Sequence, residues 1–269
     1  MTTGTCIFNT GSDHGGTQVQ CLQEIYDAPT TEMLGGTGMR PGWRCLELGA
    51  GGGSIARWMA DRVTPGEVVA VDVDTSRLEV GADVRVVEHD IRDGLPVDAP
   101  FDIIHARLVL MHMPQRAKIL EMLAEALSPG GWLVLGDFGP SLPAALTAPD
   151  CDTFLAFDRM VEVGHGVVGP TAGQSLDWGL ECGAQMERSG LVDVHSRVHS
   201  FSFDGGDTGA RYMHSLMRQV EQPLLDAGLT QEELDHGHSV LVDPRFRGWF
   251  YQFVGTRGRK PCGGSGPRH

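Results

Sequence analysis

The chain has 269 residues, 41% of them hydrophobic, and a formal net charge of −14 at pH 7. It is therefore long and apolar enough to bury the core of one large domain. The negative charge disfavours binding to nucleic acid or to an anionic membrane, because both need a basic protein surface. No apolar run approaches the roughly 18 residues of a membrane-spanning helix, and the N-terminus lacks the basic and apolar segments of a signal peptide. We expect a cytoplasmic protein.

The six cysteines never form a C-x-x-C pair, so neither a zinc site nor a disulfide framework is predicted. His195 and His199 fall on one face of a predicted strand, but no third ligand lies near them in the sequence. We therefore expect no metal.

Residues 1–42 are predicted to form a helical extension. Residues 1–12 are polar and are expected to be mobile. Apolar residues at helical spacing predict a helix over residues 17–26. A second helix is predicted to follow from residue 27, with Thr30 or Thr31 as its cap, and the glycine-punctuated residues 35–43 predict a turn.

Strands and helices then alternate over residues 43–139. Strands are predicted at residues 44–49, 67–74, 84–90, 101–108 and 132–138, and helices at residues 54–63, 75–82 and 114–131. This alternation is typical of an α/β fold, in which helices cover both faces of a parallel sheet. We expect residues 43–139 to form the core of such a fold.

The alternation ends after residue 139. Residues 140–175 are punctuated by proline and glycine, contain one predicted helix, Asp152–Val163, and are expected to form an insert. Residues 176–260 are predicted to continue the same fold, with a helix at 178–191, a strand at 192–203, helical structure at 209–228 and a final strand within 246–259. Residues 261–269 are expected to form a disordered tail.

The sequence CLELGAGGGSIARW, residues 45–58, places a glycine-rich turn between a predicted strand and a predicted helix. Glycines let the backbone approach a ligand closely, and the first turn of the helix offers unpaired N–H groups. Asp72 and Asp90 end the next two predicted strands at the same edge of the sheet, where a carboxylate can accept hydrogen bonds from ribose hydroxyls. Together these features predict a nucleoside-binding site.

Two residues narrow the identity of the ligand. The dinucleotide motif G-x-G-x-x-G requires glycine at position 54, where this chain has Ser54. Glu47 precedes the loop and would sit poorly beside a pyrophosphate, whereas it suits a ligand with a cationic amino-acid portion. S-adenosylmethionine carries a sulfonium and an ammonium group, so it is favoured over a nicotinamide dinucleotide.

Five segments, LELGAGGGS, VVAVDVD, EHDIRD, FDIIHARLVLMHMP and LSPGGWLVLGDF, resemble in order and spacing the motifs of class I S-adenosylmethionine-dependent methyltransferases. The resemblance covers residues 43–139 and points to bacterial small-molecule methyltransferases of natural-product clusters. It implies a Rossmann-like, mostly parallel sheet of seven strands with an antiparallel last strand. It also implies that the N-terminal helical segment folds over the cofactor and that residues 140–175 form a lid over the acceptor.

The resemblance implies cofactor contacts at the positions that match these motifs. Glu47 would reach the ammonium group, Asp72 the ribose hydroxyls and Asp90 the adenine amino group. The remaining implied contacts come from the glycine loop, the adenine side, the end of the fourth strand and the N-terminal helix: Gly49, Ala50, Gly51, Gly53, Val73, Ile91, Ala106, Arg107 and Tyr26. Arg107 departs from the small or amide residue common at its position, which leaves the role of its side chain open.

Methyl transfer is an in-line displacement in which alignment supplies much of the catalysis, and a base is needed only when the accepting atom must lose a proton. His112 follows the fourth strand and is a candidate base, or else a histidine that caps or packs a helix. His165, in the insert, is the second candidate, or else a solvated loop residue. Asp137 faces the same edge of the sheet or simply forms a turn.

The insert, residues 140–175, is expected to determine which molecule accepts the methyl group. Its stripe of Phe154, Phe157 and Met160 is either core packing or, together with Phe138, the wall of an apolar pocket. With an apolar pocket, the acceptor is a small, largely apolar or aromatic metabolite, methylated at O, N or C in secondary metabolism. The alternative is a protein that binds S-adenosylmethionine without transferring its methyl group, in a cyclase-like or binding role. An apolar N-terminal helix could also support a homo-oligomer.

Overall fold

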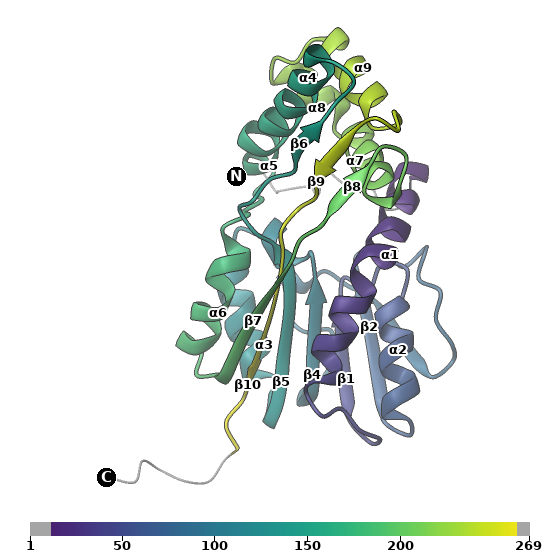
Figure 1. Cartoon of the computed structure of the whole chain (residues 1–269). Coiled ribbons are helices and arrows are strands. Elements are labelled where there is room, and N and C mark those ends of the chain that lie inside the picture. The colour runs from purple at the N-terminus through teal and green to yellow at the C-terminus, as the bar shows by residue number, and fades with distance from the viewer. Residues whose placement is uncertain (1–11, 263–269) are drawn as a thin grey trace.

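The computed structural model describes residues 12–262. A large sheet flanked by helices forms the lower part of the molecule in Figure 1, and a smaller group of helices and short strands forms the upper part. We call this upper part, residues 144–171 and 202–249, the cap. The segment expected to be mobile lies outside the described residues except for Ser12, and the expected tail lies outside them from residue 263 onward.

Within residues 12–262 the large sheet has seven strands in the order β3-β2-β1-β4-β5-β10-β7. They are β1 (Arg44–Leu48), β2 (Glu67–Asp72), β3 (Val84–Glu88), β4 (Phe101–Arg107), β5 (Leu127–Phe138), β7 (Val192–His199) and β10 (Phe253–Arg259). The first five strands pair in parallel, and β10 pairs antiparallel with both β5 and β7. The predicted α/β fold, with its mostly parallel seven-stranded sheet and antiparallel last strand, is confirmed.

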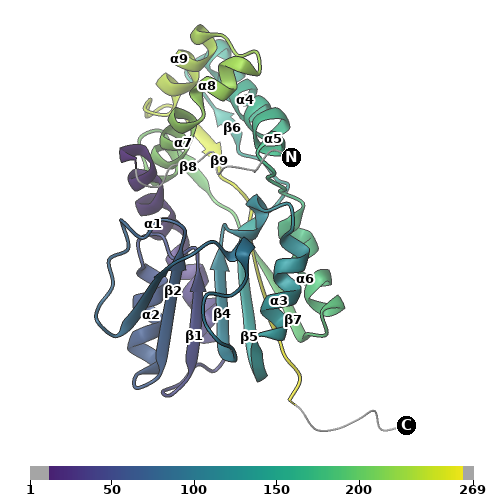
Figure 2. The same cartoon turned by 180° about the vertical axis from the view of Figure 1, so that it is seen from behind.

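Helices cover both faces of this sheet (Figures 1 and 2). On one face lie α1 (Asp13–Gly35) and α2 (Ser54–Val63), and on the other lie α3 (Arg116–Glu125) and α6 (Trp178–Arg188). Successive residues of a strand point to opposite faces, so Cys45 packs in the core cluster of α2 whereas Leu46 and Leu48 pack in the cluster of α3. Among the described helices, none is long and apolar enough to cross a lipid bilayer.

Two separate segments of the chain build the cap. The first contributes β6 (Ala144–Thr147), α4 (Cys151–Val163), a π-helix (Gly164–Val168) and α5 (Gly169–Thr171). The second contributes β8 (Ser202–Asp204), α7 (Thr208–Gln219), α8 (Glu221–Asp226), α9 (Gln231–Val240) and β9 (Arg247–Trp249). A small antiparallel sheet in the order β6-β9-β8 joins them. Residues 140–175, the expected lid, therefore supply only part of this layer.

The chain crosses between the two layers in places where a single strand was predicted. Residues 192–203 form β7 in the large sheet and then β8 in the cap, and residues 246–259 form β9 in the cap and then β10 in the large sheet. In both segments the pairing continues, since β8 pairs with β9 and β7 pairs with β10. The alternation of apolar residues changes phase between Val198 and Phe201, and Trp249, Phe250 and Tyr251 are consecutive, so both crossings coincide with breaks in the two-residue period.

Helix boundaries also differ from those predicted. Residues 75–82 form a turn rather than a helix, since so short a segment ending in Val80 and Gly81 lacks the propensity and packing to nucleate one. The two helices expected over residues 17–34 are one continuous helix, α1, with Pro29 inside it. The helix predicted over residues 114–131 is confined to Arg116–Glu125, because β5 already begins at Leu127. Helix α9 was not predicted.

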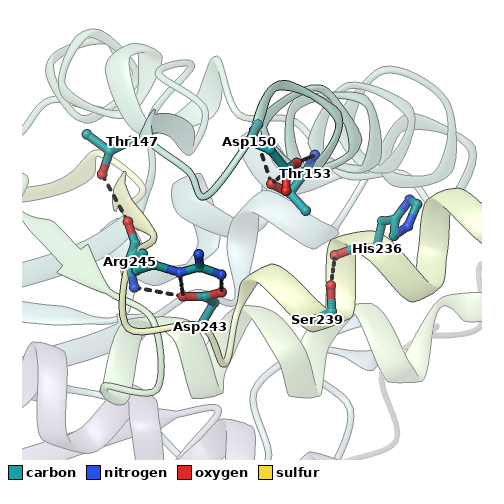
Figure 3. Close-up of polar contacts among 7 residues, drawn as sticks. All are labelled: Thr147, Asp150, Thr153, His236, Ser239, Asp243 and Arg245. Carbon is teal, nitrogen blue, oxygen red and sulfur yellow. Dashed lines mark hydrogen bonds and ion pairs between the residues drawn. The ribbon is translucent and has the colours of Figure 1, made fainter.

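Figure 3 shows polar contacts within the cap, of which one, between Thr147 and Arg245, joins its two segments. Asp150 caps α4, because its carboxylate accepts hydrogen bonds from the backbone N and the Oγ1 of Thr153 at 2.9 and 2.8 Å. Arg245, in the turn before β9, donates to Asp243 from Nε at 3.0 Å and from Nη2 at 2.6 Å, and its carbonyl accepts from Oγ1 of Thr147 at 3.4 Å. The bonds from Arg245 lower the pKa of Asp243 to about 2.

Candidate active site

A cavity of about 570 Å³ lies at the carboxyl ends of the parallel strands. Its wall comprises the glycine loop after β1, the ends of β2, β3 and β4, and one side of α1. Ligands of open α/β sheets bind at this edge. The volume is within the range of small-molecule sites, so the cavity is large enough for a nucleoside-containing cofactor.

The glycine loop adopts the backbone that its sequence favours. Gly49, Gly51 and Gly53 have φ values of 65°, 53° and 80°, a left-handed conformation that only glycine adopts at little cost. At Gly49 a Cβ atom would also lie 2.3 Å from the side chain of Val109. The loop is fixed to β2, because the backbone N of Gly49 and of Ala50 both donate to the carbonyl of Val71, at 2.8 and 3.1 Å.

Asp72 and Asp90, both predicted to contact the cofactor, line the cavity. Burial raises the pKa of Asp72, opposed by the hydrogen bond that its Oδ2 accepts from the backbone N of Gly51 at 2.8 Å. Asp90 caps a short 3₁₀ helix, Ile91–Asp93, and accepts hydrogen bonds from Nε of Arg92 at 3.0 and 2.8 Å. Arg92 lowers the pKa of Asp90. Asp72 thus joins the loop to β2 and presents a carboxylate to the cavity.

Of the twelve residues predicted to contact the cofactor, eight line the cavity: Gly49, Ala50, Gly51, Asp72, Val73, Asp90, Ile91 and Arg107. Four do not: Tyr26, Glu47, Gly53 and Ala106. Gly53 instead forms the N-cap of α2. The α1 residues Val19, Leu22 and Gln23 were not predicted, because they belong to no recognisable motif. After β4, His112 was predicted as a candidate base, but no contact was assigned to its neighbours Leu108, Val109 and Met113, although they lie in the motif FDIIHARLVLMHMP.

Glu47 and Tyr26 are buried in the core. Oε2 of Glu47 lies 2.7 Å from Nδ1 of His105, and Glu47 is only 3% exposed. The expected contact between this carboxylate and an ammonium group is therefore not what the structure shows. Tyr26 stacks on Phe253 with ring centroids 4.4 Å apart, and its hydroxyl has no hydrogen-bond partner among the described residues. Glu47 thus pairs with a neighbouring strand inside the sheet, and Tyr26 packs α1 against β10.

The side chain of Arg107, whose role the sequence leaves open, binds α1. Nη1 of Arg107 donates to Oδ1 of Asp27 at 2.9 Å and lies 3.3 Å from Oγ1 of Thr30. Asp27 also accepts from Oγ of Ser54 at 3.1 Å. One carboxylate on α1 therefore ties this helix both to the end of β4 and to the first residue of α2, on either side of the glycine loop.

A second, inner cavity of about 170 Å³ lies between the sheet edge and the cap. It shares four wall residues with the cofactor cavity: Val19, Leu22, Leu108 and His112. Leu108 has a φ of 56° and donates from its backbone N to the carbonyl of Gly136 at 2.7 Å. A left-handed conformation in a branched residue is costly and is typical of functional sites. The junction between the two cavities is thus held by β4 and β5.

His112 lies at this junction, in a short 3₁₀ helix, Leu110–His112. Burial, and secondarily Arg116, lower its pKa to about 4. The imidazole is therefore neutral at pH 7. Asp137, in β5, is 3% exposed and burial raises its pKa to about 7, but it lines neither cavity. Of these two residues, only His112 is placed to meet a reacting group.

His165 is the second predicted histidine, and it lines the inner cavity rather than an open loop. Its Nε2 lies 2.7 Å from the hydroxyl of Tyr251, and burial lowers its pKa to about 4, opposed by a hydrogen bond with Gln174. Tyr251 in turn stacks on Phe138, with ring centroids 4.2 Å apart. Tyr251 was not predicted as a site residue, because its sequence neighbours gave only the signal of a strand.

The aromatic stripe of α4 belongs to the core. Phe157 and Met160 are fully buried, and Phe157 packs on Phe246 with ring centroids 4.9 Å apart. Neither they nor Phe154 lines the cofactor cavity or the inner cavity. The apolar wall is instead formed by Phe138, as expected, together with Tyr212 and Tyr251. Across residues 12–262 there is no group of three histidine, cysteine or acidic side chains placed to hold a metal ion.

Comparison with known proteins agrees with this architecture. A family model described as a methyltransferase domain matches residues 22–197. The 27-O-demethylrifamycin SV methyltransferase of Amycolatopsis mediterranei (strain S699) is 35% identical over 184 residues, 63% of this chain and 61% of that enzyme. Methyltransferase str2 of Strobilurus tenacellus is 27% identical over 199 residues, 70% of this chain and 72% of that protein. The match thus spans under two thirds of the rifamycin enzyme.

Among solved structures, the phosphoethanolamine N-methyltransferase 2 of Haemonchus contortus, in complex with S-adenosyl-L-methionine, is similar in fold. The TM-score is 0.54 at 17% identity, over 94% of this chain and 58% of that chain. The strand order, the glycine loop with Asp72 beside it, and the family match lead to one assignment. The chain belongs to the class I S-adenosylmethionine-dependent methyltransferases.

Proposed function

We propose that this protein transfers the methyl group of S-adenosylmethionine to O, N or C of a small, largely apolar or aromatic metabolite in secondary metabolism. The observation that carries the proposal is the junction of the two cavities. The larger one fits the cofactor, the smaller one is lined mainly by apolar and aromatic side chains, and they meet at Leu108 and His112. A donor and an acceptor held in these cavities would face each other across that junction.

The cofactor fits the larger cavity on the geometry of its wall. The left-handed glycines let the loop backbone lie close to the ligand, and Asp72 offers a carboxylate for the ribose hydroxyls. Val73, which is 58% exposed, and Ile91 supply apolar surface for the adenine ring. The bound cofactor supplies an electrophilic methyl group. Asp90 would accept from the adenine amino group while it keeps its pairing with Arg92.

The chain's own contribution is to align the reactants and to keep water out. Alignment of a bound nucleophile with its target lowers the barrier by up to roughly 7–11 kcal/mol in well-oriented systems. Where the acceptor is a hydroxyl or an amine, its proton must leave as the new bond to carbon forms. His112 is the side chain that would accept this proton, because it lies at the junction of the two cavities. Its pKa, lowered to about 4 by burial, makes it a weak base. His165 and Tyr251 would orient the acceptor from the far wall.

The relatives favour a role in secondary metabolism. One is named as a methyltransferase of a rifamycin, and str2 is a methyltransferase of Strobilurus tenacellus. The aromatic wall of the inner cavity, formed by Phe138, Tyr212 and Tyr251, favours an apolar or aromatic acceptor over a macromolecule.

The test is transfer of a labelled methyl group. Purified protein would be incubated with methyl-labelled S-adenosylmethionine and, separately, with catechol, hydroquinone, 27-O-demethylrifamycin SV, transfer RNA and a protein extract. We expect label in one or more of the small molecules, and a loss of at least tenfold in rate in the His112→Ala variant if the product is an ether or an amine. Label found only in RNA or protein, or no binding of S-adenosylmethionine, would contradict the proposal.

A further inference from the structure

A third cavity adjoins the inner cavity on the side away from the cofactor. This outer cavity has a volume of about 570 Å³, and its wall comes from residues 140–144, from α4 and from residues 165–177. It shares His165 and Gln174 with the inner cavity. The wall between the two cavities therefore consists largely of these two side chains and of the π-helix backbone that carries His165.

The inner cavity alone is small. Its volume of about 170 Å³ is close to that of an engineered cavity of about 150 Å³ that binds benzene. It therefore holds one ring or a short branched chain, and the rest of a larger acceptor needs space elsewhere. On one side of it lies the cofactor cavity, and on the other lies the outer cavity.

The dividing wall is closed in this structure by a hydrogen bond between His165 and Gln174, and Nε2 of His165 also lies 2.7 Å from the hydroxyl of Tyr251. Opening the wall separates His165 from Gln174, and the glycine-rich backbone that carries His165 permits that movement. Gly164 and Gly166 belong to the π-helix, and Gly169 follows it. Single-turn π-helices often occur at functional sites, and glycines place no side chain in the way of a movement. The pKa of His165 is lowered to about 4 by burial, so the wall is uncharged at neutral pH. An uncharged part of a ligand can therefore pass beside His165 without meeting a charge.

The wall of the outer cavity is apolar and acidic. Pro140, Leu142 and Leu176 are among its apolar members. Its polar side chains include three carboxylates, those of Asp158, Asp177 and Glu162, and the uncharged His165, Gln174 and Ser175. This described wall contains no lysine or arginine side chain. The negative charge of Glu162 is balanced by Arg159, whose Nη1 lies 2.9 Å from Oε2 of Glu162. The carboxylate of Asp158 accepts a hydrogen bond from the backbone N of Ala145. A negatively charged ligand would be repelled here.

We infer that the outer cavity is a second part of the acceptor site, and that the acceptor is an elongated molecule with an apolar arm free of negative charge. Its compact head, which carries the methyl-accepting atom, occupies the inner cavity, and its arm passes between His165 and Gln174 into the outer cavity. This inference rests on the proposed function for the identity of the head as the methylated part. The binding of an arm is a separate claim and can be measured separately.

The test uses three probes that share one head: phenol, 4-butylphenol and 5-(4-hydroxyphenyl)pentanoate. Each is titrated by calorimetry into the full chain, with and without saturating S-adenosylhomocysteine. We expect 4-butylphenol to bind at least tenfold more tightly than phenol, since about two buried methylene groups give that factor. The pentanoate is expected to bind at least tenfold more weakly than 4-butylphenol, because its carboxylate would face Asp158 and Asp177.

Two variants locate the effect. Gly166 lines the outer cavity, and a Cβ there meets no heavy atom within 4 Å, so Gly166→Phe adds a ring at the wall of this cavity without a clash and should reduce the gain of 4-butylphenol over phenol. Gly35→Phe, where a Cβ likewise meets nothing within 4 Å at the end of α1, is the matched control and should keep the gain. In the double variant Asp158→Asn/Asp177→Asn, the penalty on the pentanoate should shrink severalfold.

Each outcome bears on one claim. An unchanged gain in Gly166→Phe, equal binding of pentanoate and 4-butylphenol, or no binding of any probe would overturn the inference. If S-adenosylhomocysteine failed to bind, the proposed function would be overturned instead. The inference about the arm would still be tested, because the three probes are also compared without S-adenosylhomocysteine.

Discussion

Oε2 of Glu47 lies 2.7 Å from Nδ1 of His105, and both side chains are almost fully buried between neighbouring strands β1 and β4. The acid at the entrance of the glycine loop is therefore held inside the sheet. A buried polar group that loses its partner leaves the other group unsatisfied, which costs more than the pair itself contributes. This relationship makes Glu47 a residue of the scaffold that holds the loop in place.

We predict that Glu47→Ala lowers the free energy of unfolding by about 2–4 kcal/mol, because His105 is left buried without its partner. Urea denaturation monitored by circular dichroism would measure the loss. Glu67→Ala is the matched control, since Glu67 pairs with Arg44 at 2.6 Å but is 41% exposed, and its loss should stay below about 1 kcal/mol. Equal losses in the two variants would show that burial of the pair is not the cause.

We predict that Asp72→Ala weakens the binding of S-adenosylhomocysteine by about 1.5–3 kcal/mol, the usual range for hydrogen bonds to a charged group. The variant loses both a carboxylate in the cofactor cavity and the acceptor of the backbone N of Gly51. Titration calorimetry would measure the affinity. Asp74→Ala changes a nearby carboxylate that does not line the cavity and should bind almost as the parent protein does.

We predict that Arg107→Met loosens α1, because the variant removes the hydrogen bond at 2.9 Å to Asp27. Hydrogen–deuterium exchange in α1 should become faster, and the affinity for S-adenosylhomocysteine should fall by about three- to tenfold, since α1 supplies part of the cavity wall. Arg197→Met is the control, because Arg197 pairs with Glu32 of α1 at an exposed site. If exchange in α1 were unaltered in Arg107→Met, Asp27 would not be its anchor.

We predict that stability falls as the pH is lowered through 6.5 toward 4, and that His238 contributes to this fall. His238, in α9, is 4% exposed and packs on His214 of α7, and neither of its ring nitrogens has a hydrogen-bond partner among the described residues. Burial first, and then Arg218 and His214, lower its pKa from 6.5 to about 4, while Glu221 and Asp235 oppose the shift. Between these pH values the unfolded chain binds more protons than the folded one, so acid favours unfolding.

The measurement is the free energy of unfolding in urea at pH 7 and at pH 5. His238→Phe should lose less stability between the two values than the parent protein, whereas His236→Phe, at an exposed position of the same helix, should lose as much. Asp137 has the opposite effect on the pH dependence of stability, because its pKa is raised to about 7 and the folded chain therefore binds more protons than the unfolded one. Asp137 is present in all three proteins, so its effect cancels in the comparison. Identical losses in all three proteins would exclude His238 as a contributor.

The part of the fold that the sequence predicts is the part encoded by short-range patterns. Residues 43–139 alternate between strands and helices with clear periods, and the carboxyl ends of parallel strands share one edge, so the loop and Asp72 could be placed together in advance. In the cap, the helical segments α4, α7 and α8 were predicted from their own periodicity. Their assembly into one layer was not predicted, because it depends on where β7 and β10 leave the large sheet. Those crossings are set by pairing between residues 201–204 and 247–250, which no local pattern reports.

The residues of the candidate site likewise fall into those with a local sequence signal and those that only the fold brings together. Asp72 and the glycines carry signals of their own, because a left-handed turn needs glycine at defined positions. The pair of His165 and Tyr251 spans 86 residues of sequence, and the two come from different segments, so their contact could be known only from the folded chain. The fate of Glu47 was equally hidden, since its partner His105 lies on the neighbouring strand β4.

The position of α1 has a consequence for the order of events in turnover. Its first half supplies Val19 and Leu22 to the walls of both the cofactor cavity and the inner cavity, and Gln18 binds Gln219 of α7 at 2.7 Å. An outward swing of this segment would wet both chambers in a single movement. Such a movement would open the cofactor cavity and the inner cavity together, so exchange of the donor and exchange of the acceptor would be coupled.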